Sequence, residues 1–324
     1  MNTSIVPNTS GTLNAFGTSV AGTSPLEARY DDAAKLLLSF RPVLGKLLTA
    51  CIPACRDMTL EEAMACILDS TAEIADPERL YESRVIGMNT EVIFSKIGKA
   101  QYDLCFCILV KGRKIQVIIE MFSGAPKYSP ENKNVFYLAA NVVRQKNNAF
   151  FDDDYDSMQE TYLISIMADP KASDRDTAYQ YDFEKKGLFN HCVQNAEDYR
   201  GMMHMTDLRL GGSYETGEEI ERIMKLLFTE TEMAGEEKAV ILENEFGMKT
   251  SEYMMEVMDD MCDLSRGLIS IGEERGEKRG EKKAEKAAVI RLIQNGISDA
   301  VIAVAFPDLS EQEYHAYRQE ALNA

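Results

Sequence analysis

This chain of 324 residues has no tryptophan, only three histidines and no long hydrophobic run. Because a membrane-spanning helix needs roughly 18 consecutive apolar residues, we expect no membrane partner. The N-terminus has neither the basic start nor the apolar segment of a secretory signal. Residues 1–27, which are rich in Ser, Thr, Asn and Gly, are expected to form a disordered leader.

The cysteines and histidines are scattered. The seven cysteines are an odd number at irregular spacings, and Cys105 and Cys107 fall inside a predicted strand. This pattern is typical of reduced core thiols in a cytoplasmic protein rather than of a disulfide framework. His191, His204 and His315 lie in distant segments, so we predict no catalytic role for them.

Negative charge dominates the chain but is unevenly distributed. The net charge is −18, and residues 211–270 contain fifteen acidic and five basic residues. Residues 86–150, in contrast, contain nine basic and four acidic residues. Docking on phosphates depends on the local potential, so the overall acidity does not exclude DNA as a partner.

Two predicted strands near the middle of the chain each carry one acid in an apolar run. Asp103 lies in Tyr102–Val110 and Glu120 lies in Ile115–Phe122. A two-residue loop at Lys111–Gly112 places the two acids opposite each other, with Cβ atoms about 5 Å apart. A four-residue loop would shift the pairing by two positions and leave Glu120 as a diagonal neighbour of Asp103.

Two carboxylates at this separation repel each other unless a proton or a cation lies between them. A divalent metal is the usual reason for such an arrangement, and Glu91 would complete a triad for one or two Mg²⁺ ions. In the alternative interpretation, Asp103 lies near a strand end in solvent and Glu120 pairs with a basic neighbour.

The remaining pattern predicts an α/β fold in which a helix crosses over so that later strands join the sheet. We expect a helix over 30–48 interrupted near Pro42, a capping box at 59–62 opening a short helix, a helix over 134–150 and strands over 161–168, 177–183 and 202–210. In the helix over 134–150, Phe136, Ala139, Ala140 and Val143 are predicted to face inward.

After residue 212 the pattern is helical. An α/β domain over 28–212 is therefore expected to precede an acidic helical region over 213–270 and a charged helix with a short tail over 271–324. The tail has three short helical pieces that resemble a helix-turn-helix, and a plain helical tail is the alternative. The charged helix and tail are compatible with a homo-oligomer.

Four segments carry a resemblance: GMNTE at 87–91, YDLCF at 102–106, VIIEM at 117–121 and FYLA…Q at 136–145. They resemble the PD-(D/E)xK nuclease superfamily, and the transposase-like, recombination-promoting branch is the most similar. The resemblance implies a restriction-endonuclease-like mixed central sheet flanked by helices, with an α-helical C-terminal extension. It also implies Mg²⁺ or Mn²⁺ as cofactor, DNA as partner, Asp103, Glu120 and Glu91 as metal ligands, and Gln145 at a polar position of the branch.

One residue departs from the superfamily pattern. Phe122 stands two residues after Glu120, where the superfamily has Lys or Gln, and a phenyl ring cannot orient water or offset charge. Such a loss is worth about 10²- to 10⁴-fold in rate. Either the chain is a weakened relative that still binds DNA, or Lys127, Gln145 or Lys146 supplies the missing group, or Glu120 is misidentified. A lysine introduced at position 122 should then raise activity.

These observations predict a Mg²⁺-dependent DNA endonuclease acting in recombination or transposition. The alternative is a catalytically inactive protein of the same fold that acts as a DNA-binding or protein-interaction module.

Overall fold

A computed structural model describes residues 25–68, 85, 91–94, 98–146, 148–183, 188 and 201–323. The leader expected over 1–27 therefore lies almost wholly outside the described residues. The chain divides into two compact units, Met1–Ser265 and Arg266–Ala324, and each is described by itself. In the part of the chain described, no helix combines the length and the apolar character needed to cross a membrane.

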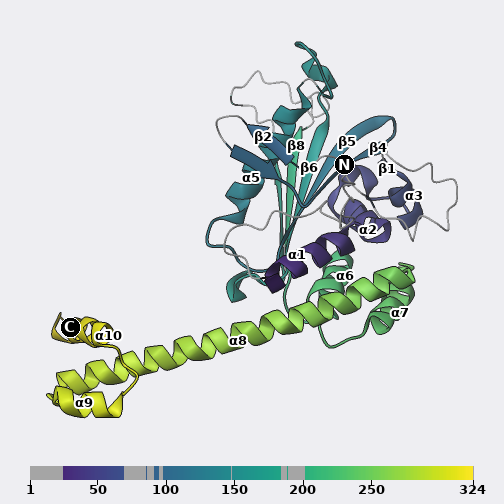
Figure 1. Cartoon of the computed structure of the whole chain (residues 1–324). Coiled ribbons are helices and arrows are strands. Elements are labelled where there is room, and N and C mark those ends of the chain that lie inside the picture. Colours follow the sequence, from purple (N-terminus) through teal and green to yellow (C-terminus); the bar gives the residue numbers. More distant parts are fainter. Residues whose placement is uncertain are drawn as a thin grey trace, which may run out of the picture. The chain divides into compact units, whose positions relative to one another are not determined.

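The first unit contains a mixed six-stranded sheet with the order β1-β4-β5-β6-β8-β7 (Figure 1). Its central strands β5, β6 and β8 run parallel, and the other neighbours are antiparallel. The α/β prediction is thus confirmed at the level of a mixed sheet with flanking helices. The strands are β1 (Ile67–Leu68), β4 (Leu104–Val110), β5 (Arg113–Phe122), β6 (Glu160–Met167), β7 (Thr177–Asp182) and β8 (Met203–Arg209).

Three short strands were not predicted. β2 (Glu91–Phe94) and β3 (Gly98–Gln101) pair with each other in a separate two-stranded sheet. β1 covers residues of the helix that the sequence predicts to open at 59–62 and to continue as far as Leu68. The helix α3 (Leu60–Ala65) ends earlier, and the chain pairs with β4 instead.

The turn between β4 and β5 has the predicted length. Val110 pairs with Arg113, and the two residues between them, Lys111 and Gly112, have φ angles of 49° and 78°. Two successive positive φ values define the type I′ turn, whose twist matches that of paired strands. The register that follows is the one predicted from the two-residue loop.

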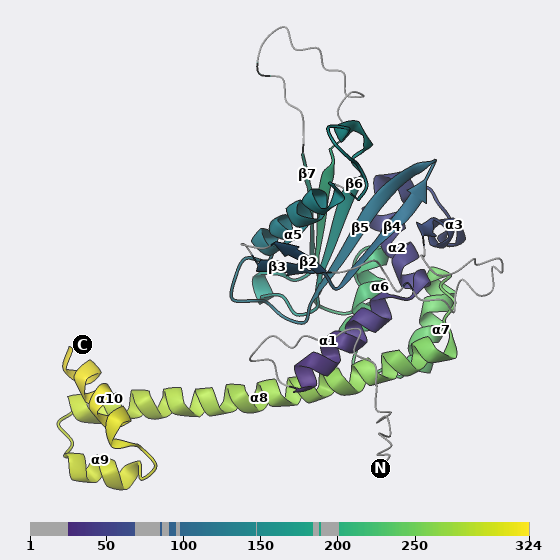
Figure 2. The same cartoon turned by 45° about the horizontal axis from the view of Figure 1, so that its top comes forward.

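Helices cover both faces of the sheet. α5 (Pro130–Gln145) lies along one face (Figure 1), and α2 (Arg41–Cys51) and α6 (Glu219–Phe228) lie toward the other (Figure 2). The break expected near Pro42 separates α1 (Pro25–Leu38) from α2, since proline is tolerated only in the first turn of a helix. α7 (Gly235–Phe246) follows α6.

The helix α5 differs from its prediction at both ends and in its buried face. It begins at a Ser129 N-cap followed by Pro130 and ends at Gln145, so it starts four residues earlier than expected. Phe136 and Val143 are exposed, whereas the buried stripe contains Asn134, Leu138, Asn141 and Gln145. The physical reason is that the sheet face under α5 is itself partly polar.

The second unit is helical. α8 (Glu252–Gln294) enters it, followed by α9 (Asp299–Ala305) and α10 (Glu311–Asn323). The Asp299 carboxylate at the start of α9 accepts hydrogen bonds from Tyr314 and Arg318 of α10. α9 and α10 match the last two helical pieces predicted for the tail, whereas the first piece is continuous with α8, which runs unbroken to Gln294.

Candidate functional site

Polar side chains cross the centre of the sheet under α5. Glu120, Ser165 and Asp207 are successive Cα partners on β5, β6 and β8, and all three are fully buried. They lie on the sheet face that α5 covers. Cys105 contacts the Asn141 side chain of α5 and is the Cα partner of Ile118. Glu120 lies two residues after Ile118 on the same strand and therefore shares its face. An apolar sheet face therefore gives way to a polar row below the first turns of this helix.

Asp103 extends this row to the end of β4. Its backbone N–H donates to Glu120 Oε1 at 3.3 Å, and its carboxylate Oδ2 accepts from the backbone N–H of Met121 at 2.8 Å. The two carboxylates thus face each other across neighbouring strands, as the sequence predicts. Just beyond the last paired residues of β4 and β5, these carboxylates accept the backbone hydrogen bonds that carbonyl groups accept within the sheet.

Each of these carboxylates has a lysine partner from a helix. Lys35 Nζ of α1 lies 3.2 Å from Asp103 Oδ1 and 2.5 Å from Asp31 Oδ2. Lys133 Nζ of α5 lies 2.7 Å from Glu120 Oε2. The alternative in which Glu120 pairs with a basic neighbour is therefore correct for these contacts, although Asp103 is only 14% exposed and does not stand in open solvent.

The lysines do not fully offset the cost of burying two acids together. Burial and the Asp103 charge raise the pKa of Glu120 to about 8, against the opposing effect of Lys133. Burial also raises the pKa of Asp103, against the opposing effect of Lys35. Although burial works the other way, the neighbouring Glu120 carboxylate raises the pKa of Lys133. Ionising both acids at once is therefore unfavourable with these two lysines alone.

Phe122 supports Lys133. The Lys133 ammonium lies 4.6 Å from the centre of the Phe122 ring and 4.8 Å from that of Tyr137, so two aromatic faces flank it while it binds Glu120. Such contacts are worth roughly 0.5–2 kcal/mol each. Lys133 was absent from the sequence candidates. The Ser129–Pro130 start signal of α5 would have placed it in the first turn, beside the end of β5.

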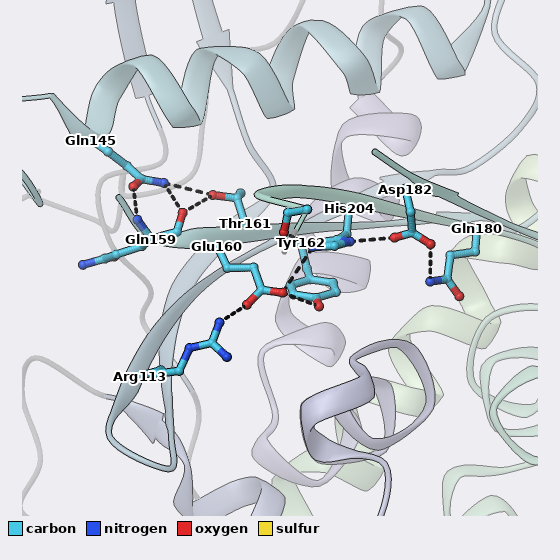
Figure 3. Close-up of polar contacts among 10 residues, drawn as sticks. Arg113, Gln145, Gln159, Glu160, Thr161, Tyr162, Gln180, Asp182 and His204 are labelled. Atoms are coloured by element: carbon cyan, nitrogen blue, oxygen red, sulfur yellow. Dashed lines mark hydrogen bonds and ion pairs between the residues drawn. The ribbon is translucent and has the colours of Figure 1, made fainter. Parts of the chain in front are cut away.

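The structure places Gln145 away from the acids, which corrects its candidacy for the missing group. Its amide Nε2 donates to the Gln159 carbonyl and to Thr161 Oγ1, and its Oε1 accepts from the Gln159 N–H (Figure 3). Thr161 precedes Ser165, the partner of Glu120, by four residues, or about 13 Å along a strand. Gln145 is a structural residue that joins α5 to the start of β6.

Lys146 and Lys127 have other surroundings than the acid pair, and for Glu91 only the backbone is described. Lys146 donates to the Asp152 carbonyl and lies over the rings of Phe150 and Tyr155. Lys127 is exposed in the loop between β5 and α5 and lines a cavity there. Glu91 pairs through its backbone with Gln101, two residues before Asp103, but its side chain lies outside the described residues.

The donors at the pair suit a hard cation. Mg²⁺ is commonly held by one or two carboxylates with water completing its shell. Among the residues whose side chains are described, no group of three His, Cys, Asp or Glu side chains forms a ligand set. A divalent ion would therefore be held by Asp103 and Glu120, with Glu91 as the third acid that the sequence suggests.

A second polar cluster lies at the other end of β6 and was not predicted. His204 Nδ1 lies 2.6 Å from Asp182 Oδ1, and its Nε2 lies 3.2 Å from Glu160 Oε1 (Figure 3). Burial lowers its pKa, but hydrogen bonds to Glu160 and Asp182 raise it to about 9 in balance. With both ring nitrogens engaged and Tyr162 stacked on the ring at 4.3 Å, the imidazole ties three strands together.

Comparison of the chain with models of protein families, with curated proteins and with solved structures found no match.

Proposed function

We propose that this protein is a Mg²⁺-dependent DNA endonuclease of the PD-(D/E)xK type, with Asp103 and Glu120 as metal ligands. The observation that supports it most is the position of these two carboxylates across neighbouring strands, where Glu120 accepts from the Asp103 N–H and Asp103 accepts from the Met121 N–H. The raised pKa of Glu120 supports it further, because a cation bound beside the two carboxylates would offset the cost of ionising this buried acid next to Asp103. When bound, Mg²⁺ would polarise the scissile phosphate and lower the pKa of its bound water.

Lys133 takes over the task of the superfamily lysine in this proposal. Its ammonium is 2.7 Å from Glu120, where it can offset negative charge that develops on a phosphate. The rings of Phe122 and Tyr137 hold it there. The missing group thus comes from the helix that follows β5 rather than from β5 itself.

Plasmid nicking in Mg²⁺ or Mn²⁺ tests the proposal. Asp103→Ala should abolish nicking, and Lys133→Met should lower the single-turnover rate at saturating DNA by about 10²- to 10⁴-fold. Lys114→Met is the matched control, since it removes an exposed ammonium at the opposite end of β5 and should leave that rate unchanged. Equal nicking by the wild type and Asp103→Ala, or no nicking at any metal concentration, contradicts the proposal.

A second candidate is a catalytically inactive protein that retains the fold and binds DNA or a protein. It is favoured by the lysines that already occupy both carboxylates and by Phe122 at the superfamily Lys or Gln position. DNA binding without nicking, and without any effect of Mg²⁺ on stability, would support this candidate instead.

A further inference from the structure

An open cavity lies next to the acid pair, at the ends of β5, β6 and β8. Its volume is about 350 Å³, within the range of ligand sites. We call it the lysine pocket, and it is lined by residues 125–131, Met167, Lys171, Asp174 and Arg209. Met167 is the Cα partner of Phe122, so the pocket begins about 7 Å along the strand from Glu120.

The pocket combines three basic and two acidic side chains. Its two acidic residues, Glu131 and Asp174, are both bound to Arg209, which is itself held by the buried Asp207. Lys127 and Lys171 are exposed and form no ion pair with any residue that the structure describes. Arg209 alone cannot neutralise three carboxylates, so the pocket together with Asp207 is neutral overall, and the two ammonium groups are its cations that are free of ion pairs within the described part of the chain.

An exposed aromatic residue lines the same pocket. Tyr128 is 56% exposed and follows Lys127 directly in the loop. Cationic side chains beside a free aromatic face are the pattern by which proteins hold a single nucleic-acid strand, with phosphates on the lysines and a base on the ring. A buried tyrosine or a pocket with free acids would not fit this use.

We propose that the lysine pocket binds the DNA strand next to the phosphate at the acid pair. Lys127 and Lys171 contact a backbone phosphate, and the base of that nucleotide stacks on Tyr128. Successive phosphates of one strand rise by about 3.4 Å along the duplex axis, so the first or second phosphate beyond Glu120 falls at the pocket. The inference rests on the proposed function for the identity of the polymer.

Fluorescence anisotropy of the full chain with labelled DNA of about 20 nucleotides, single-stranded or duplex, tests the pocket in EDTA. For Lys127→Ala/Lys171→Ala, the slope of log K against log [salt] on duplex should fall by about 0.9 for each phosphate that the variant no longer neutralises. Lys111→Asn/Lys114→Ala is the matched control, because it removes two exposed ammonium groups at the opposite end of β5 and should leave the slope unchanged.

The stacking of a base on Tyr128 has its own test. Tyr128→Ala should weaken single-strand binding by about 5- to 150-fold at an unchanged salt slope, and Tyr128→Phe should restore it. The proposal is overturned if both lysine pairs change the slope equally, if Tyr128→Ala has no effect, or if the wild type binds no DNA. DNA binding that depends on the pocket residues, without nicking, would support the pocket and refute the nuclease. Nicking that is unchanged in these variants would support the nuclease and refute the pocket.

Discussion

Replacing Glu120 by glutamine should make the protein more stable at alkaline pH. Glu120 is fully buried, and its pKa of about 8 lies well above the ordinary value of 4.5. Between these two pH values the folded protein keeps the proton and the unfolded chain loses it, so ionisation disfavours the fold. The stability that protonated Glu120 contributes is complete below pH 4.5 and is lost as the pH rises through 8.

The size of the effect follows from the shift in pKa. One unit corresponds to about 1.36 kcal/mol, so a shift from 4.5 to about 8 amounts to roughly 5 kcal/mol in the free energy of unfolding. A glutamine side chain cannot ionise and escapes this loss. In urea unfolding without divalent metal, the free energy of unfolding of Glu120→Gln relative to the wild type should therefore increase by about 1.4 kcal/mol per pH unit between about pH 5.5 and 8.

Glu131→Gln provides the control. The hydrogen bond from Ser129 lowers the pKa of Glu131, so this acid titrates below the tested range and its replacement should show no pH trend. A stability difference between Glu120→Gln and wild type that stays flat across the same pH range would refute the reasoning. It would mean that Glu120 remains ionised at neutral pH, fully compensated by Lys133.

Three further predictions concern side chains around the site. Lysine at position 122 would replace a ring 4.6 Å from the Lys133 ammonium by a second ammonium that repels it. Phe122→Lys should therefore lower nicking, contrary to the expectation from sequence. Phe122→Tyr keeps the ring and should retain nicking. Gln145→Leu leaves buried partners without hydrogen bonds and should cost about 2–4 kcal/mol in urea unfolding with an unchanged nicking rate per folded molecule. His204→Gln should destabilise the protein by roughly 3 kcal/mol more at about pH 6 than at about pH 9.5. The reason is that the stability gained from a His204 pKa raised to about 9 is complete below pH 6.5 and is lost as the pH rises through 9. Equal losses of stability at both pH values would contradict this.

Local rules predicted the hairpin and its register. Gly112 tolerates a positive φ and Lys111 adopts one beside it, and this two-residue turn fixes which residues face each other on β4 and β5. The capping boxes at Thr59 and Ser310 were likewise predictable, because a side-chain oxygen and a glutamate three residues later satisfy the first N–H groups of a helix. Each of these features depends only on neighbours in the sequence.

The inward face of α5 depended on its surroundings instead. Hydrophobic spacing selected Phe136 and Val143, yet the helix buries Asn134 and Gln145 on the sheet face that carries Ser165, Asp207 and Thr161, where Gln145 donates to Thr161. A rule that puts apolar residues inside fails wherever the opposing surface is polar. The partners of the acids were hidden for the same reason, since Lys35 and Lys133 reach the pair only after α1 and α5 pack on the sheet.

Phe122 takes on a different meaning once α5 is in place. Sequence alone presents it as the loss of a cation, because side chains two residues apart on a strand share a face. In the folded chain that face already receives the ammonium of Lys133, and a second lysine would repel it. An aromatic ring instead attracts the ammonium and stays buried at 7% exposure, next to Met167 at the edge of the lysine pocket. Position 122 and Lys133 therefore act as one unit, and an aromatic residue at 122 is what a lysine supplied from the helix requires.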